Sequence, residues 1–345
     1  MSPPIIDDVI GFKGEWFDER PQIIKHYVVK YFSKTHEVEM QDLKAHRTFL
    51  KRSKLPESIL PGDFQLDNQV LIYGRLIKLT EYADPLTKSR LGPSTEKTLV
   101  FMKPSAYKNF GNILAKLEAS NYSFMSVKTV GLFGNEALSV GDMLGVTADS
   151  LTDGLGVSCC LLVRGSTNGA ADLLAEFGQG VVCNRNEKVV DYFFANKAAT
   201  TATLDNCTLC LIKSHSVKAK NTGMILNSIL EQGYEVSAIE SYTLDRAIAE
   251  EFFGLYKGTV ADYGHHIDEL ISGPVVAIEI RAEDAVNTFR KSAGPYDIEM
   301  AKELFPASIR ARFGEDNVRN GVHCTDLETD GKSECSYFFD VLHED

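Results

Sequence analysis

The stretch Ser308–Asp326, SIRARFGEDNVRNGVHCTD, gathers the side chains of this chain that could perform chemistry. It holds three arginines, then Asn320 and, three residues later, His323. An arginine guanidinium grips phosphate oxygens in pairs, and a histidine titrates near neutral pH, so part of it is a neutral nucleophile. Such a set suits phosphoryl transfer. The alternative is a solvated arginine-rich helix end beside a structural histidine, and these residues alone leave both open.

The composition is that of an ordinary globular protein of 345 residues, with 44% hydrophobic and 24% charged residues. This length allows two or three domains. The formal net charge of -12 disfavours a general nucleic-acid or anionic-membrane binder, so an anionic ligand needs a local cluster of cations. No apolar stretch approaches the ~18 residues of a transmembrane helix, and the acidic start predicts no signal peptide. Seven scattered cysteines indicate reduced thiols, and we expect a soluble intracellular protein.

Residues 1–93 show the alternation typical of β-strands. Apolar side chains share one face in HYVVKYF and in EVEM, and residues 69–82 form a longer run in which Gly74 predicts a bulge or bend. Residues 42–56 carry a basic run from Lys44 to Lys54. This run is either a solvated basic loop or a docking patch for an acidic partner. Trp16 is expected to pack the small core.

Motifs in this first segment resemble a known module. EWFD, VEMQDLKAHRTFLKRSK and LIYGRLIKLTEYAD are similar to the small pleckstrin-like β domain of axonemal proteins. In the nucleoside diphosphate kinase homolog seven family, one copy of that domain precedes two kinase-type domains. The resemblance implies that residues 1–93 form a microtubule-docking domain of cilia or flagella.

After a linker with Pro and Gly at residues 84–94, the chain repeats itself. Residues 98–128 and 208–240 each show an apolar strand ending in a lysine (Lys103, Lys213), an amphipathic helix and a second strand. GVSCCLLVR and GPVVAIEIR then match as buried strands. The pattern predicts two tandem α+β copies, at residues 95–197 and 203–345. We also expect the two copies to pair as an intramolecular pseudo-dimer.

The two copies are unequal in length. Copy two contains, from Phe289 through Asp326, a segment that copy one lacks. When the copies are aligned through the preceding valines, Cys183 of copy one falls at the position of His323, and copy one has no arginine for Arg290 or Arg310. Any catalysis is therefore expected in copy two.

Copy two resembles a nucleoside diphosphate kinase domain over nearly all of residues 205–342. The resemblance rests on the strand ending in Lys213, on SGPVVAIEI and SIRARFG, on the spacing of Asn320 and His323, and on the closing pair of phenylalanines. It implies a ferredoxin-like βαββαβ fold for each copy, so the whole chain is expected to be α+β. It also implies ping-pong transfer of the γ-phosphate of a nucleoside triphosphate through phospho-His323, with Mg²⁺ bridging the nucleotide phosphates and few ligands expected from the protein, none of which is named. The implied substrate-binding residues are Lys213, Tyr256, Arg290, Arg310 and Asn320, and the residues implied to orient the imidazole are Thr325 and Glu334.

Copy two also departs from the family pattern. Ser214–His215 stands where the family has Pro–Asp, which predicts a less fixed turn after Lys213. The loop after Tyr256 lacks the family's arginine and paired phenylalanines, and Tyr263 either stacks on a base or lies on the surface. The family's threonine phosphate contact has no clear counterpart in residues 294–300. We interpret His265 and His266 as solvated loop residues, and Cys207 and Cys210 as strand residues rather than a zinc site.

Three functions stay open at this point, one of them a nucleotide-sensing module that binds without turnover. Copy one, which lacks the candidate site residues, and the basic first domain favour a mainly structural protein of ciliary doublet microtubules. The alternative is an active nucleoside diphosphate kinase. The implied partners are tubulin and other axonemal proteins together with nucleoside di- and triphosphates, without nucleic acid or membrane. The expected location is the cytoplasm, the cytoskeleton and the axoneme of a cilium or flagellum.

Overall fold

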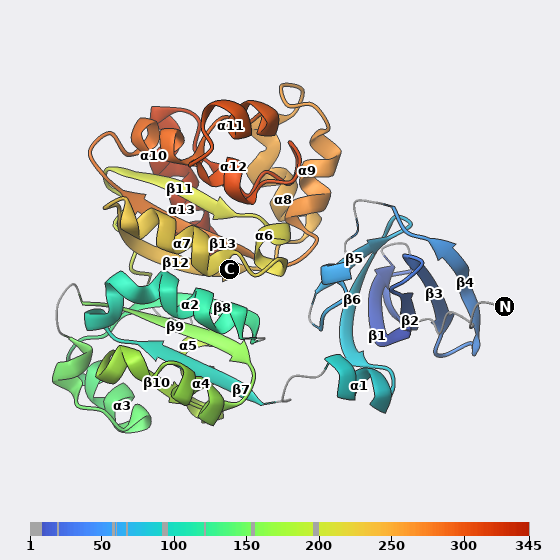
Figure 1. Cartoon of the computed structure of the whole chain (residues 1–345), viewed down its shortest axis with the longest axis horizontal. Coiled ribbons are helices and arrows are strands. Elements are labelled where there is room, and N and C mark those ends of the chain that lie inside the picture. Colours follow the sequence, from blue (N-terminus) through green and yellow to red (C-terminus); the bar gives the residue numbers. More distant parts are fainter. Residues whose placement is uncertain are drawn as a thin grey trace. The chain divides into compact units, whose positions relative to one another are not determined.

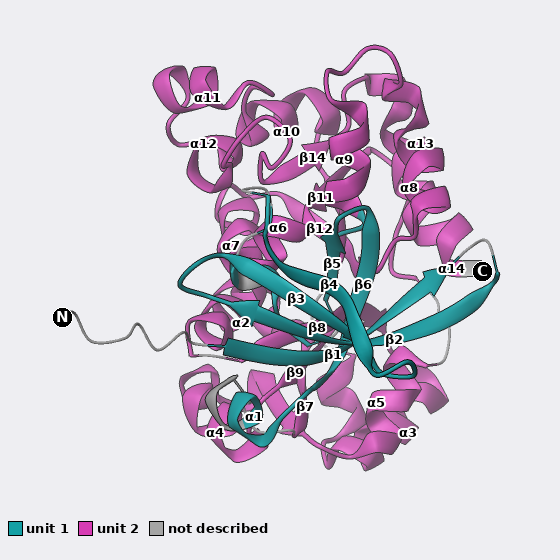
Figure 2. Ribbon diagram, turned by 90° about the vertical axis from the view of Figure 1, so that its right-hand side faces the viewer, with its two compact units in different colours: residues 1–92, 271–273 teal, residues 93–270, 274–345 magenta. Residues whose placement is uncertain are grey.

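A computed structural model describes residues 9–18, 21–56, 59, 61–66, 68–91, 96–120, 122–152, 156–195 and 200–344. The chain divides into two compact units, residues 1–92 with 271–273 and residues 93–270 with 274–345 (Figure 2). No helix within the described ranges is long and apolar enough to cross a membrane.

The first unit is built on an antiparallel sheet of six strands in the order β4-β3-β2-β1-β6-β5 (Figure 1). Its core contains the apolar faces expected from the sequence, including Tyr27 and Val29 of one strand and Val38 and Met40 of the next. Trp16 is partly buried at the margin of this core. The strands are β1 (Val9–Asp18), β2 (Ile23–Phe32), β3 (Glu37–Asp42), β4 (Arg47–Lys54), β5 (Gln69–Ile72) and β6 (Arg75–Tyr82), followed by helix α1 (Pro85–Leu91).

Two details of the first unit differ from the sequence interpretation. Residues 69–82 form a hairpin rather than one bent strand, because Tyr73 and Gly74 both adopt positive φ (47° and 77°), as a two-residue turn requires. The basic run is not a loop, since most of it forms the edge strand β4. Every side chain of β4 is exposed or half-buried.

The second unit contains one sheet of eight strands in the order β10-β7-β9-β8-β12-β13-β11-β14. The strands of copy one stand in the order fourth, first, third and second, and those of copy two follow in the reverse order, which is the ferredoxin-like arrangement in both copies. The α+β fold class predicted from the sequence is confirmed. The strands are β7 (Lys97–Met102), β8 (Ser123–Gly131), β9 (Val157–Arg164) and β10 (Val181–Asn184) in copy one, and β11 (Cys207–Ile212), β12 (Glu235–Tyr242), β13 (Val275–Arg281) and β14 (Val322–Cys324) in copy two.

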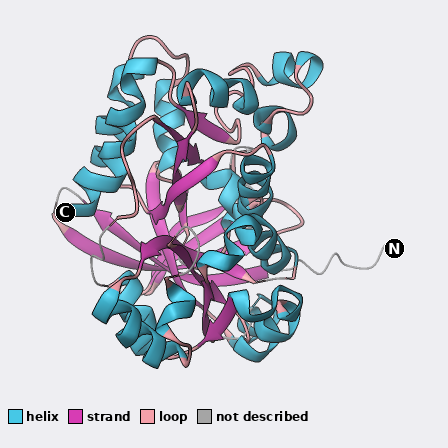
Figure 3. Ribbon diagram, turned by 90° about the vertical axis from the view of Figure 1, so that its left-hand side faces the viewer, coloured by secondary structure: helices cyan, strands magenta, loops and turns pink. Residues whose placement is uncertain are grey.

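Helices flank this central sheet (Figure 3). Three helices of copy two begin at side-chain caps, where Asp245, Asp297 and Ser308 accept a hydrogen bond from a backbone N–H of the first turn. The helices of copy one are α2 (Phe110–Ala119), α3 (Gly134–Leu144), α4 (Thr167–Leu173) and α5 (Glu187–Phe194). Those of copy two are α6 (Ser214–Lys218), α7 (Thr222–Glu231), α8 (Arg246–Phe252), α9 (Tyr263–Leu270), α10 (Ala285–Ala293), α11 (Ile298–Leu304), α12 (Ile309–Phe313), α13 (Gly331–Ser336) and α14 (Leu342–Glu344).

The two copies pair through their equivalent elements, which confirms the expected internal pseudo-dimer. Strand β8 meets strand β12 with Lys128 opposite Glu240, and the ammonium nitrogen lies 3.2 Å from the carboxylate. These two residues are themselves equivalents, since each stands six residues after the matching tyrosine of its copy. Both side chains are largely buried, so the pair is screened little by solvent.

Helices α2 and α7 pack on each other beside this strand pair. Gly111 of α2 faces Asn227, and its equivalent Gly223 of α7 faces Ala115. A Cβ at Gly223 would lie 2.1 Å from the backbone nitrogen of Ala115, so the absence of a side chain sets the distance between the helices. One continuous core, from Val100 to Cys324, joins both copies.

Glu118 of copy one provides a pH-sensitive contact at this interface. Its Oε2 accepts a hydrogen bond from the backbone nitrogen of Gly223 at 2.9 Å, and burial raises the pKa of Glu118 from 4.5 to about 7. Because the folded protein holds this proton more tightly than the unfolded chain, Glu118 should lower the free energy of unfolding as pH rises from about 4.5 to 7.

The Glu118→Gln variant should lose this pH dependence, worth up to about 3 kcal/mol between pH 4.5 and 7.5. Urea unfolding at several pH values measures the difference between wild type and variant. The exposed Glu187→Gln serves as control. Parallel stability curves for wild type and Glu118→Gln would contradict the assignment.

Candidate active site

The ends of two neighbouring strands define a cavity in copy two. Lys213 follows β11 directly, and His323 lies in β14 opposite Leu211 of β11. Helix α12 contributes Arg310, and the turn before β14 contributes Asn320. These side chains line a cavity of about 260 Å³, close to the lower end of the range for small-molecule sites. The other residues that line it are Phe253, Tyr256, Thr259, Val260, Ala261, His266, Tyr296, Val322 and Asp326.

A carboxylate contacts one ring nitrogen of His323. Its Nε2 lies 3.0 Å from Oε2 of Glu334, which comes from helix α13. Thr325 donates to the same oxygen at 2.9 Å and accepts a hydrogen bond from the backbone nitrogen of Leu209 at 3.1 Å. In a neutral imidazole, a carboxylate at Nε2 keeps the proton on that nitrogen, so Nδ1 carries the lone pair. This is the arrangement that a nucleophilic histidine needs.

Aromatic rings surround the imidazole of His323. Phe252 and Tyr256 contact it edge to face, with ring centroids 5.4 and 5.7 Å away. The hydroxyl of Tyr256 points toward the second oxygen of Glu334 at 3.5 Å. Burial raises the pKa of Tyr256, so this hydroxyl stays neutral beside the carboxylate.

Two buried cations face the cavity. The Nζ of Lys213 donates to the carbonyl oxygen of Val318 at 2.8 Å, and burial, helped by the nearby Arg310, lowers the pKa of Lys213 to about 7. Arg310 donates to the carbonyl oxygen of Gly294 at 2.8 Å. An incoming phosphate would favour the charged lysine, because an opposite charge raises the pKa of an amine.

Arg290 and Asn320 complete the set predicted from the sequence. Arg290 does not line the cavity; it pairs with Asp326, which does, through a contact of 3.4 Å. Asn320 is buried, and its Oδ1 has no hydrogen-bond partner among the described residues. A buried amide oxygen without a partner is costly, so a ligand that donates to it would be favoured.

The turn after Lys213 is fixed, contrary to the expectation from the missing proline. His215 is buried, and both its Nδ1 and its backbone nitrogen lie within 2.8 Å of Oε1 of Glu269. Its Nε2 accepts a hydrogen bond from the backbone nitrogen of Gly321 at 3.1 Å. His215 therefore ties the turn after β11 to the turn that precedes His323.

His266 was wrongly interpreted as a solvated loop residue, whereas His265 is exposed as expected. His266 lies on α9, buried, with its ring stacked on Phe253 at 5.3 Å. Its Nε2 lies 2.7 Å from the hydroxyl of Tyr296. The spacing of Tyr263, His266 and Ile267 along one helix face is the signal that could have revealed this burial.

Copy one does not carry a nucleophile at the matching position. In the sheet, Val182 lies opposite Phe101 as His323 lies opposite Leu211, so Val182 occupies the place of the histidine. Equivalent backbone hydrogen bonds fix both registers: the backbone nitrogen of Lys103 donates to the carbonyl oxygen of Gly180, and the backbone nitrogen of Lys213 donates to that of Gly321. The alignment that placed Cys183 at this position was wrong by one residue.

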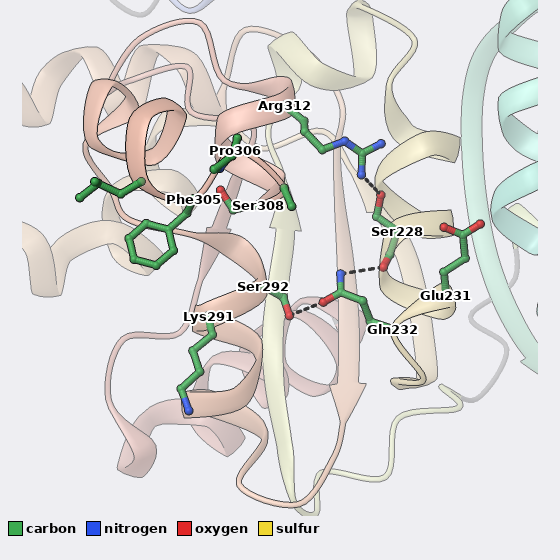
Figure 4. Close-up of a pocket in the computed structure, with 11 residues that line it drawn as sticks. Ser228, Glu231, Gln232, Lys291, Ser292, Phe305, Pro306, Ser308 and Arg312 are labelled. Atoms are coloured by element: carbon green, nitrogen blue, oxygen red, sulfur yellow. Dashed lines mark hydrogen bonds between the residues drawn. The ribbon is translucent and has the colours of Figure 1, made fainter.

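Two other clusters do not make an active site. Cys207, Glu279 and Cys335 lie together in the core, but the Glu279 carboxylate already accepts hydrogen bonds from Thr203 and Leu204 at 2.8 and 2.7 Å. A groove of about 660 Å³ between α7, α10 and α12 is larger than the His323 cavity (Figure 4). Its polar side chains bond to one another: Arg312 to Ser228, and Ser292 to Gln232.

Comparison with known proteins gives a consistent result. A family model described as nucleoside diphosphate kinase matches residues 206–343. "Nucleoside diphosphate kinase homolog 7" of Rattus norvegicus is 32% identical to this chain, and the match covers 99% of this chain and 95% of that protein. The Mus musculus protein of the same description is 33% identical with the same coverage. A nucleoside diphosphate kinase of Aquifex aeolicus is 30% identical over 39% of this chain and 94% of that protein.

Proposed function

This chain belongs to the nucleoside diphosphate kinase homolog 7 family, and from this premise we propose that copy two transfers the γ-phosphate of a nucleoside triphosphate to a nucleoside diphosphate through phospho-His323. The observation that carries the proposal is the pairing of His323 Nε2 with Glu334 in a cavity that also holds Lys213 and Arg310. Copy one has Val182 at the matching position and is assigned no chemistry.

In the first half of the reaction, the Nδ1 lone pair of His323 attacks the γ-phosphorus, and the bond from that phosphorus to the bridging oxygen breaks. The electron pair leaves with the nucleoside diphosphate. In the second half, a terminal phosphate oxygen of another nucleoside diphosphate attacks the same phosphorus, and the P–N bond breaks. Lys213 and Arg310 offset the charge on the equatorial oxygens, while Glu334 stabilises the positive charge that develops on the imidazole.

Magnesium suits this site as a companion of the nucleotide. Mg²⁺ prefers oxygen ligands and usually takes one or two carboxylates together with substrate phosphates. Among the described residues that line the cavity, Asp326 is the one that offers a carboxylate, so Asp326 would hold the ion. When bound, the ion would supply positive charge that offsets the negative charge of the phosphate oxygens.

Incubation with γ-labelled ATP and magnesium tests the proposal. The full-length protein should become labelled in an acid-labile, alkali-stable form, as expected of a P–N bond, and unlabelled nucleoside diphosphate should remove the label. A wild-type protein that stays unlabelled would overturn the proposal.

We also propose that the first unit docks on ciliary doublet microtubules, with tubulin and other axonemal proteins as partners. The proposed location is the cytoplasm and cytoskeleton, in the axoneme of a cilium or flagellum. Strand β4 supports this, because it is an edge strand with exposed Arg47, Lys51 and Lys54, and such a surface is complementary to an acidic partner. The retained fold of copy one supports a structural duty, since it keeps the shared sheet without a nucleophile.

Reversing two charges of β4 should separate docking from catalysis. The double variant Arg47→Glu with Lys51→Glu is expected to weaken co-sedimentation with microtubules by about tenfold at low salt, because both cations are lost from the rim of the interface. The control reverses the exposed Lys257 and Lys302, which changes the net charge equally. Equal binding by both double variants would remove β4 from the docking surface.

A further inference from the structure

The cavity of copy two contains a hydrogen-bonded pair, His266 and Tyr296, that the family pattern did not assign. His266 comes from α9, and Tyr296 follows Gly294 in the segment that leads to α11. Both line the cavity with Lys213 and Arg310. The distance between His266 Nε2 and the Tyr296 hydroxyl is 2.7 Å.

The pair lies near both buried cations, with which it lines the cavity. The carbonyl oxygen of Gly294, two residues before Tyr296, accepts a hydrogen bond from Arg310 at 2.8 Å. Burial, and after it the charge of the nearby Lys213, lowers the pKa of His266 to about 4. A neutral imidazole and a tyrosine hydroxyl therefore stand beside the groups that face phosphate oxygens.

The pair has one proton more than its own hydrogen bond uses. A neutral imidazole carries one N–H, and tyrosine carries one O–H. If the hydroxyl donates to Nε2, the remaining proton is on Nδ1; if Nε2–H donates to the hydroxyl oxygen, the remaining proton is on the hydroxyl. The Nδ1 atom of His266 is buried and has no partner among the described residues, so a proton on it would lack an acceptor, which favours the arrangement that leaves the free proton on the Tyr296 hydroxyl.

We propose that the His266–Tyr296 pair donates this proton as a hydrogen bond to a phosphate oxygen of the bound nucleoside di- or triphosphate, alongside Lys213 and Arg310. The cations around the pair select an anionic acceptor rather than a base or a sugar. The pair thereby supplies the hydroxyl-type phosphate contact for which residues 294–300 had no clear counterpart. This inference rests on the proposed function in one respect, namely that the ligand is a nucleoside di- or triphosphate.

Nucleotide binding by a catalytically silent protein tests this inference. In a His323→Asn background, Tyr296→Phe should weaken binding of ADP with magnesium by about tenfold, as expected for loss of one hydrogen bond to a charged group, in isothermal titration calorimetry. Binding of adenosine, which has no phosphate, should stay unchanged. His266→Phe, which keeps the ring on Phe253, should have the same effect, and the double variant should lose no more than either single variant.

Tyr263→Phe is the matched control, because Tyr263 stacks on the same Phe253 but does not line the cavity. An equal loss for adenosine, or unchanged ADP affinity in Tyr296→Phe with native unfolding temperature, would overturn the inference. Because the readout is binding, a wild-type protein that binds ADP but forms no phosphohistidine would refute the proposed reaction and leave this result intact.

Discussion

The His323→Asn variant is expected to form no acid-labile phosphoprotein and to lose γ-phosphate transfer by at least about 10³-fold, because no other nucleophile replaces an attacking side chain. Asparagine keeps an amide near Glu334, so the fold should persist. Copy one has Val182 at the equivalent position, so there is no second histidine there that would also have to be replaced.

Two further variants make the result specific to this histidine. The exposed His265→Asn should keep full labelling, which controls for the loss of any histidine. Glu334→Gln should label slowly rather than not at all, since the amide still holds the ring but no longer carries the charge that stabilises the imidazolium. Label that persists in His323→Asn at the wild-type level would place the nucleophile elsewhere.

The second large effect is expected at the helix pair between the copies. Gly223→Val should lower the free energy of unfolding by about 3 kcal/mol or more, because its Cβ would lie 2.1 and 2.5 Å from backbone atoms of Ala115. Backbone atoms cannot rotate away as a flexible side chain can, so helices α2 and α7 must move apart. Urea unfolding measures the loss.

Gly264→Ala is the control for this prediction. It lies on a helix of copy two, and a Cβ there would meet no atom within 4 Å. This substitution should be neutral or stabilising by up to about 1 kcal/mol, as for glycines in open helical positions. A Gly223→Val protein as stable as Gly264→Ala would show that the helices are not held at this distance.

The sequence was most informative where periodicity and repetition act together. The two copies share apolar strands and an amphipathic helix with the same spacing, so the repeat and the α+β class followed directly from sequence patterns such as GVSCCLLVR and GPVVAIEIR. Lys213, Arg310, Asn320 and His323 could be named because copy two resembles a nucleoside diphosphate kinase domain at these positions. The sheet then brings them to one cavity.

Features that depend on contacts between distant segments could not be read from local patterns. His266 is buried by Phe253 and bonded to Tyr296, thirty residues away. Strand β10 has only four residues, and a slip of one changes none of its apolar character; the bond between Lys103 and Gly180 sets the register that places Val182 rather than Cys183 at the histidine's position. Short strands carry too little pattern to resolve such a shift.

The pairing of Lys128 with Glu240 has a consequence for how the two copies persist together. In a symmetric dimer of identical chains, a residue on the two-fold axis faces itself, so two copies of either half would bring lysine to lysine or glutamate to glutamate. Removing one partner of a buried pair typically costs about 3–5 kcal/mol, since the other charge is left uncompensated. With opposite charges at this point, neither half could be discarded without harm to the other, even though copy one has Val182 where copy two has the histidine. The half without the histidine is retained as an obligate companion of the half that keeps it.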